Sequence, residues 1–292
     1  MKELIKKLQK YEIRIRKVIN DQMHGDFHSV FKGTGLEFDD VRAYQYGDDV
    51  RAIDWNVSAK GHGTFVKTYK EEKEQSVFLI LDVSASQAIG PEGQQKINVG
   101  KEICGVLALA AARQTSQIGM VCISDQKEKY IKPGRGNDHA FSMIKALFEL
   151  TPASDKTDLA GGIKQALNLI KRRSLILLIS DFIDLNYERE MSMLARKHDL
   201  VVIHLMDKRE KALPPMGIIP LLDKETGRTV WVNTSSAHFQ ETYLATNAQN
   251  QEKIVKICRK QKANYLAINT DDDYVPQLVN LFRLRNKIRK SA

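Results

Sequence analysis

The stretch Val77-Phe-Leu-Ile-Leu-Asp82-Val-Ser84-Ala-Ser86 decides the fold. Its first five residues are all apolar, and such a run is typical of a strand that is buried on both faces of a parallel sheet. The run stops abruptly at Asp82, and the small polar residues after it indicate a loop at the carboxyl end of the strand. We therefore expect a sheet to begin with this strand.

Strands and helices alternate from this point onward. A second apolar run, Leu175–Ile179, also stops at polar residues, Ser180 and Asp181. The other predicted elements are helices at 97–113, 139–150, 159–170 and 187–197, and strands at 118–123 and 200–206. Such alternation predicts a doubly wound α/β fold, with a mostly parallel sheet and helices on both of its faces.

The regular alternation ends after Asp207. Prolines and glycines crowd the next stretch, so we expect a hairpin insertion near 213–233. The last predicted elements are a helix at 237–262, a strand at 265–268 and a helix at 275–288. We expect residues 76–292 to form one domain.

The first 75 residues are expected to form a separate N-terminal part. Residues 1–20 carry apolar side chains at helical spacing, with lysine and arginine on the opposite face. This pattern predicts an amphipathic helix that packs on its own domain or, alternatively, lies on a membrane surface. Between Gly25 and Gly63 the sequence is too rich in glycine for a long helix, and short strands and turns are expected.

Charge and cysteine content narrow the class of protein. The 292 residues carry a net charge of +9, but residues 2–17 and 283–290 alone carry +10, which leaves about −1 for the rest. The body is therefore no basic nucleic-acid surface, and a scaffold that binds membrane or nucleic acid through its two ends is the alternative. Three cysteines without a close pair, no apolar leader and no apolar run near the roughly 20 residues of a membrane span favour a cytoplasmic protein.

Five side chains that carry oxygen are expected to meet at one rim of the sheet, beyond the carboxyl ends of its strands. They are Asp82, Ser84, Ser86, Thr157 and Asp181. Open α/β sheets bind ligands at this rim, and Mg²⁺ or Mn²⁺ prefers oxygen ligands and retains several waters. With few direct anionic ligands, such an ion keeps its affinity for a carboxylate of a partner. The alternative is that the serines, Thr157 or Asp158 only cap helices.

These five residues resemble the metal-ion-dependent adhesion site of von Willebrand factor A domains. That pattern is Asp-x-Ser-x-Ser after the first strand, a Thr in a later loop and an Asp after a following strand, and all five positions match in order. The resemblance implies a von Willebrand factor A-like, Rossmann-type domain that holds partners through its metal ion. The sequence departs from the pattern at Gln87, where a methionine is common.

A second resemblance lies upstream, between Gly33 and Lys60. The chain reads Gly33-Thr-Gly-Leu-Glu37-Phe-Asp-Asp-Val-Arg42, then Tyr44, Gly47-Asp-Asp-Val-Arg51, Ile53-Asp-Trp55 and Ser58-Ala-Lys60. This stretch is similar to the signature of the bacterial domain-of-unknown-function 58 family, many of whose members carry transmembrane helices. Members are commonly linked to MoxR-type AAA+ ATPases, so the resemblance implies an adaptor for such an ATPase in the assembly or activation of protein complexes.

The charged residues of this signature have two interpretations. Arginine pairs bidentately with carboxylates, so they can form a buried network of ion pairs and hydrogen bonds that fixes an irregular segment. Alternatively, they form a docking surface for the ATPase. The candidate residues of that surface are Glu37, Arg42, Asp48, Asp49, Arg51, Asp54 and Trp55.

Enzyme classes with a comparable fold lack their key residues here. Haloacid-dehalogenase-like phosphatases need a second carboxylate two residues after the first aspartate, and Ser84 at that position cannot shuttle a proton at neutral pH. The sequence contains no phosphate-binding loop, nucleophile elbow or dinucleotide fingerprint. His24 and His28 have no third ligand nearby, so zinc is not expected. We expect a protein without catalytic activity.

Overall fold

The computed structural model describes most of the chain. The described residues are 32–61, 63–74, 76–88, 95–112, 116–184, 186–208, 215–222 and 229–290, together with residues 5, 6, 9 and 13. They divide into two compact units, Lys32–Gln75 and a larger unit that contains Ser76–Ala292. Most of the helix expected over 1–20, the pair His24 and His28, and the turn expected within the hairpin at 223–227 lie outside the described residues.

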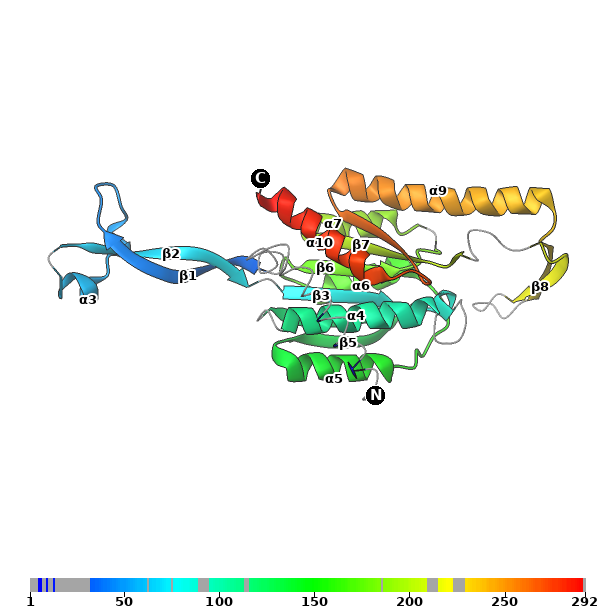
Figure 1. Ribbon diagram of the computed structural model, residues 1–292, viewed down its shortest axis with the longest axis horizontal. Helices are drawn as coiled ribbons and strands as arrows, with labels where there is room; N and C mark the ends of the chain where they lie inside the picture. The colour runs from blue at the N-terminus through cyan, green and yellow to red at the C-terminus, as the bar shows by residue number, and fades with distance from the viewer. Residues whose placement is uncertain are drawn as a thin grey trace. The chain divides into compact units, whose positions relative to one another are not determined.

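The larger unit is built on a sheet whose described strands lie in the order β10-β7-β6-β3-β4-β5 (Figure 1). These strands are β3 Ser76–Asp82, β4 Gln117–Ile123, β5 Lys127–Gly134, β6 Leu175–Ser180, β7 Asp199–Met206 and β10 Asn264–Asn269. Neighbouring strands are parallel, apart from the antiparallel pair β4 and β5. The predicted doubly wound, mostly parallel fold is confirmed.

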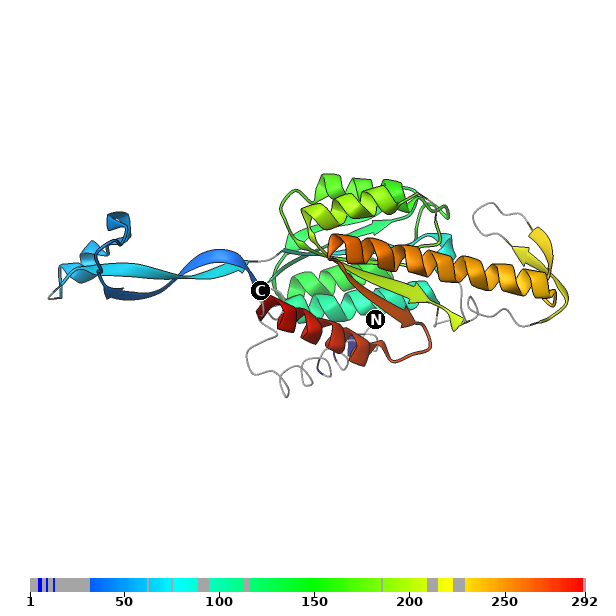
Figure 2. The same ribbon diagram turned by 90° about the horizontal axis from the view of Figure 1, so that it is seen from above.

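Helices cover both faces of this sheet (Figures 1 and 2). On one face lie α4 Lys96–Ala112, α5 Gly136–Phe148 and α10 Tyr274–Lys290, and on the other lie α6 Leu159–Leu169, α7 Glu188–Lys197 and α9 Ala237–Gln261. Leu79 and Leu81 of β3 belong to the first core, whereas Phe78 and Ile80 belong to the second. Successive side chains of a strand point to opposite faces, so the apolar run of β3 supplies both cores. No helix among the described residues is both long and apolar enough to cross a membrane.

The edge strand β5 is a departure from the sequence-based assignment, which placed no strand at 127–134. Its sequence, Lys-Glu-Lys-Tyr-Ile-Lys-Pro-Gly, is mostly charged, and its exposed and partly buried positions nearly alternate. At the edge of the sheet β5 pairs with β4 on one side only. An edge strand needs no continuous apolar run, which explains why the sequence did not reveal it.

A separate antiparallel pair lies where the hairpin was expected. It consists of β8 Ile218–Leu222 and β9 Thr229–Asn233. Ile218, Val230 and Trp231 leave more than half of their surface exposed. The pair is followed at once by α9, and the amide of Gln240 donates a hydrogen bond to the main-chain oxygen of Thr234 at this junction (2.6 Å).

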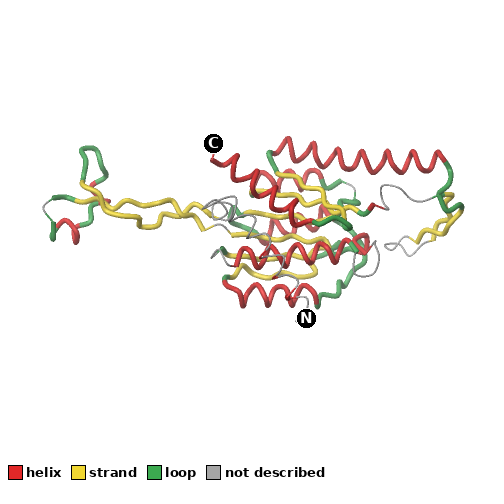
Figure 3. Tube along the Cα trace, in the orientation of Figure 1, coloured by secondary structure: helices red, strands yellow, loops and turns green. Residues whose placement is uncertain are grey.

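The smaller unit is an antiparallel pair of long strands (Figure 3). β1 Lys32–Ala43 and β2 Phe65–Glu74 are joined through the 3-10 turn η1 Val50–Ala52 and the short helix α3 Trp55–Ser58. Short strands were expected, but these have 12 and 10 residues. The register shifts between Gly33 and Leu36 and between Phe38 and Asp40. Such bulges interrupt the alternation of a strand, which accounts for the difference.

Gly162 allows α6 to lie close to β4. A Cβ atom at this position would lie 2.7 Å from Cδ1 and 2.9 Å from Cβ of Ile123. A rotamer change cannot move the Cβ atom of Ile123, so we expect Gly162→Ala to lower the free energy of unfolding by about 1 to 3 kcal/mol. Lys164→Ala, at an exposed position of the same helix, is the control and should change it by less than about 0.5 kcal/mol. Urea unfolding followed by circular dichroism measures both, and equal stability of Gly162→Ala and wild type would contradict the prediction.

Candidate metal centre

The centre of the sheet contains the point where the chain changes direction. β3 and β6 are neighbours, but the chain continues from β3 to β4 on one side and from β6 to β7 on the other. Diverging connections of this kind leave a crevice beyond the carboxyl ends of the strands. Asp82 is the last residue of β3 and Asp181 directly follows β6, and both side chains are buried.

The carboxylate of Asp82 is fixed by four donors. Its Oδ1 accepts hydrogen bonds from the main-chain nitrogen (3.0 Å) and the hydroxyl (2.6 Å) of Ser84. Its Oδ2 accepts from the hydroxyl of Ser180 (2.7 Å) and from the amide of Gln87 (3.4 Å). The Asp-x-Ser spacing therefore closes a tight turn at the end of β3, and Ser180 ties this turn to β6.

The two serines of the motif connect the two carboxylates. The hydroxyl oxygens of Ser84 and Ser86 are 3.0 Å apart, and the hydroxyl of Ser86 lies 3.4 Å from Oδ1 of Asp181. These side chains form a row across the crevice, from the end of β3 to the end of β6. The serine hydroxyls thus point to carboxylates and to each other, whereas helix capping is performed by Asp158, whose Oδ1 accepts from the main chain of Gly161 in α6 (2.8 Å).

A buried lysine also takes part in the site. Lys96 is the first residue of α4, its side chain is fully buried, and its ammonium group hydrogen-bonds Oδ2 of Asp181. Lys96 could not be recognised from the sequence, because lysine is almost never fully buried and a lysine at the start of a helix suggests solvent contact. In their ionised forms, Asp82, Asp181 and Lys96 together carry one net negative charge.

Thr157 lies between the two loops that bear these carboxylates. Two residues before it, the main-chain oxygen of Asp155 accepts from the nitrogen of Ala85 (3.2 Å). Two residues after it, the main-chain nitrogen of Leu159 donates to Asp184 (2.7 Å), in the loop that follows β6. The half-buried Thr157 is held between these contacts. The structure thus brings all five residues singled out from the sequence to one rim.

The side chains at this rim fit a hard divalent cation. The 3.0 Å between the serine hydroxyl oxygens is about the spacing of adjacent ligands in an octahedron with bonds of roughly 2.0–2.1 Å. Burial and the charge of Asp181 raise the pKa of Asp82 to about 6, and a cation beside Asp82 would favour its ionised form. Among the described residues, Oε1 of the buried Gln87 has no hydrogen-bond partner. Within the described residues no three His, Cys, Asp or Glu side chains gather as metal ligands, so the candidate depends on hydroxyls.

The signature residues of the smaller unit form local contacts. Arg42 pairs with Asp48 through two hydrogen bonds of 2.7 Å, which lower the pKa of Asp48, and Asp48 also accepts from the main chain of Gln45 (2.8 Å). Asp49 caps η1 by accepting from the nitrogen of Arg51 (2.9 Å), and Asp54 caps α3. The expected ion-pair network is present in part, but the expectation that it is buried is wrong. Arg42 is exposed because a two-stranded unit has too little volume to enclose it.

The two remaining candidate docking residues are Trp55 and Glu37. The indole of Trp55 is 70% exposed at the start of α3. Glu37 belongs to β1, where its backbone pairs with Lys70 of β2, and its side chain lies outside the described part of the chain. The candidate docking residues that the structure brings together are therefore Arg42 with Asp48, and Asp49 with Arg51.

The raised pKa of Asp82 makes the stability of the metal-free protein depend on pH. The folded chain binds this proton more tightly than the unfolded chain, where an aspartate has a pKa near 3.9. Stability is therefore expected to fall by on the order of 3 kcal/mol as the pH rises from about 4 to about 6, and to stay level above that. Asp82→Asn should lack this component in unfolding experiments performed in EDTA. Parallel pH profiles of the two proteins would contradict the prediction.

Replacing the buried Lys96 should make the free energy of unfolding depend more strongly on Mg²⁺. Lys96→Met keeps most of the unbranched apolar chain but leaves Asp181 without its ammonium group, at an expected cost of about 3 to 5 kcal/mol in EDTA. Mg²⁺ should restore more stability to this variant than to wild type and bind it about tenfold more tightly or better, because no positive charge competes beside Asp181. Calorimetry and thermal unfolding measure both effects. Lys101→Met, on the same helix but directed at the main-chain oxygen of Leu150, is the control, and an identical response of the two variants would overturn the prediction.

Comparisons with known proteins extend over most of the chain. The uncharacterized protein Rv1480 of Mycobacterium tuberculosis is 24% identical over 283 residues, which cover 96% of this chain and 89% of that protein. The uncharacterized protein MAV169 of Mycobacterium avium is 26% identical over 157 residues, which cover 53% of this chain and 92% of that protein.

The chain is also similar to solved structures and to one family model. The conserved hypothetical protein BatB of Bacteroides thetaiotaomicron has a TM-score of 0.44 at 14% identity, over 73% of this chain and 99% of that one. The VWA domain of SpRpn10 has a TM-score of 0.37 at 11% identity, over 70% of this chain and 94% of that one. The model described as "Protein of unknown function DUF58" matches residues 40–253. The chain belongs to the DUF58 family.

Proposed function

We propose that this protein is a non-catalytic, metal-dependent module for binding other proteins. The observation that carries this proposal is the row at the rim, in which two serine hydroxyls 3.0 Å apart stand between two buried carboxylates. The row lies at the point of the sheet where α/β proteins bind ligands. Its hydroxyl-rich composition fits the binding of a cation better than proton transfer.

Five residues would hold the ion. Ser84, Ser86 and Thr157 offer hydroxyl ligands, and Asp82 and Asp181 offer carboxylate charge. When bound, Mg²⁺ (or Mn²⁺) would supply a positive charge to which a carboxylate of a partner is attracted. Lys96 offsets the charge of Asp181, so the ionised side chains carry −1 against the +2 of a divalent ion. With the ion bound, the site would therefore keep a net positive charge, which favours binding of an acidic group of the partner.

The same residues are poorly arranged for catalysis. The hydroxyl of Ser84 donates to Asp82, and within the described part of the chain the two serine hydroxyls contact carboxylates and each other, with no histidine among their partners. His204 lies on the neighbouring strand, but its ring is engaged by the main-chain oxygen of Asp181 (3.0 Å) and the hydroxyl of Tyr265 (2.9 Å). A residue held in this way positions a loop, and it is not free to move a proton to a substrate.

The partner in this proposal is a MoxR-type AAA+ ATPase, or a client protein that offers an acidic residue, and the setting is the cytoplasm. Support for the ATPase comes from family resemblance, which is an association and not a contact. A second contact is proposed through the smaller unit, where Trp55 is exposed beside the ordered turns of the signature. Peripheral contact with membrane or nucleic acid through the basic ends is the alternative.

Removal of single hydroxyls tests this proposal. Thr157 and Ser86 are both half-buried, so Thr157→Ala and Ser86→Ala should lower the free energy of unfolding by about 1 kcal/mol or less. Each should nevertheless weaken binding of a MoxR-type ATPase from the same organism by about tenfold or more in Mg²⁺, because a ligand of the ion is lost. Biolayer interferometry measures the affinity, after circular dichroism has shown that the variants are folded.

Ser142→Ala is the matched control, because it removes a hydroxyl from an exposed position on α5. It should bind as wild type does. Wild-type affinity in Thr157→Ala and Ser86→Ala, or binding that is indifferent to EDTA, would show that the ATPase docks elsewhere. A loss on Trp55→Ala in the same assay would then assign the docking to the smaller unit.

A further inference from the structure

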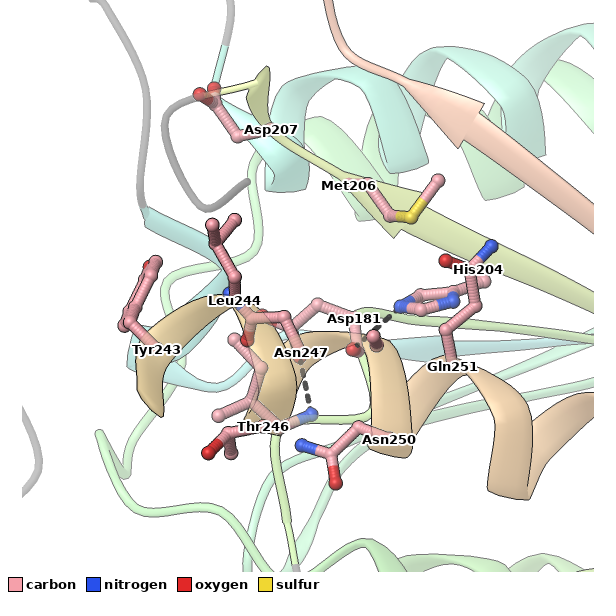
Figure 4. A pocket seen from close by; sticks show the side chains of 12 residues that line it. Asp181, His204, Met206, Asp207, Tyr243, Leu244, Thr246, Asn247, Asn250 and Gln251 are labelled. Carbon is pink, nitrogen blue, oxygen red and sulfur yellow. Dashed lines mark hydrogen bonds between the residues drawn. The ribbon is translucent and has the colours of Figure 1, made fainter. Parts of the chain in front are cut away.

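A cavity of about 650 Å³ opens beside the candidate metal centre (Figure 4). Its walls come from the carboxyl ends of β6 and β7 and from the middle of α9, between Tyr243 and Gln251. Asp181 belongs both to this wall and to the row of side chains at the rim. We call it the α9 cavity. Its size lies within the range of roughly 300–1,000 Å³ that is typical of ligand sites.

The lining of the α9 cavity suits an uncharged, partly apolar group. Ile183, Met206 and Leu244 contribute apolar surface, and Ile183 and Leu244 are 47% and 46% exposed. Large apolar side chains left exposed beside a concave wall are typical of binding sites. Asn247 and Gln251 of α9 add amide groups, which can donate to and accept from a peptide backbone.

The charges of the α9 cavity and of the rim determine which part of a ligand binds at each of these two sites. Asp181 and Asp207 are among the described residues that line the α9 cavity, and no lysine or arginine is. An anionic group is therefore disfavoured inside the cavity. At the rim the balance is opposite, because a divalent ion held there would leave the site positive. A ligand that uses both sites must carry its acid toward the rim and its apolar group into the cavity.

His204 connects the two sites mechanically. A carbonyl oxygen only accepts, so Nε2 of His204 donates to the main-chain oxygen of Asp181 (3.0 Å), while Nδ1 faces the hydroxyl of Tyr265 (2.9 Å). The ring also packs edge-on against Phe182, the residue after Asp181, with centroids 5.5 Å apart. The loop after β6 is thereby held in one place relative to β7, so the wall of the cavity and the rim are presented together.

We propose that the α9 cavity takes a large apolar side chain from the same partner segment whose carboxylate is bound at the rim. The ligand is then an extended peptide with Asp or Glu and a Leu, Ile, Met, Phe or Trp within about three residues of it. This spacing follows because one residue spans at most roughly 3.3–3.6 Å and Asp181 borders both sites. The inference rests on the proposed function, to which it adds the chemistry of the partner.

Selection from a random library of twelve-residue peptides displayed on phage tests this inference with the full chain immobilised in Mg²⁺. Enriched peptides should pair an acidic residue with a large apolar one within three positions. An enriched peptide is then synthesised in three forms: unchanged, with its acid replaced by the amide, and with its apolar residue replaced by Gly. Each replacement should weaken binding about tenfold or more.

Two matched variants test the contribution of the α9 cavity to peptide binding. Leu244→Asp places a charge in the wall of the cavity, whereas Leu284→Asp places one at a similarly exposed apolar position of α10 (50% exposed, against 46% for Leu244). The unchanged peptide should bind Leu244→Asp about tenfold more weakly or worse, and Leu284→Asp within about twofold of wild type. A far-ultraviolet circular dichroism spectrum checks that both are folded.

The outcomes separate the inference from the proposed function. Peptides that need Mg²⁺ and their acid, but tolerate Gly at the apolar position and bind Leu244→Asp normally, would overturn the role of the cavity and leave the metal function intact. Peptides that bind equally in EDTA and lack an acid would overturn the metal function. A library from which nothing is enriched counts against the cavity as a peptide site, whereas loss of binding in both Leu244→Asp and the Gly peptide supports it.

Discussion

Two carboxylates at the ends of adjacent buried strands impose the main electrostatic constraint on this fold. Asp82 and Asp181 meet because β3 and β6 are parallel neighbours whose connections diverge. Like charges in a buried crevice repel strongly, so each needs compensation. Asp82 receives it from hydroxyl and amide donors, and Asp181 from Lys96. Since Lys96 begins α4, the position of that helix along the sheet is coupled to the pair.

The sequence predicted the elements whose signal is local and missed those that depend on the environment. The all-apolar runs of β3 and β6 identify central strands without further information, and the meeting of Asp82 with Asp181 follows from the rule that carboxyl ends of parallel strands share one rim. Lys96 could not be found in this way, because nothing in its neighbours along the chain indicates burial. The α9 cavity was also missed, since Met206 and Leu244 come together only through packing. The metal itself remains a prediction, as do the ATPase and the compartment.

Carboxylates are stabilised in different ways in the two units. In the smaller unit Asp48, Asp49 and Asp54 accept hydrogen bonds from main-chain nitrogens within three residues of themselves. Turns built from such local bonds keep their shape without a core. In the larger unit the decisive bonds join residues far apart in the chain, such as Ser180 with Asp82. The signature can therefore present an exposed Trp55 on ordered turns, whereas the rim needs the complete sheet.

The composition of the edge strand β5 has a consequence for solubility. A sheet edge offers unpaired main-chain groups to which strands of other molecules can add, and this is a common route to aggregation. β5 places Lys127, Lys129 and Lys132 at exposed positions and a proline, Pro133, near its end. Charge repulsion and the missing amide hydrogen of proline both disfavour the addition of a further strand. At high concentration in the cell, growth of the sheet from this edge is therefore suppressed.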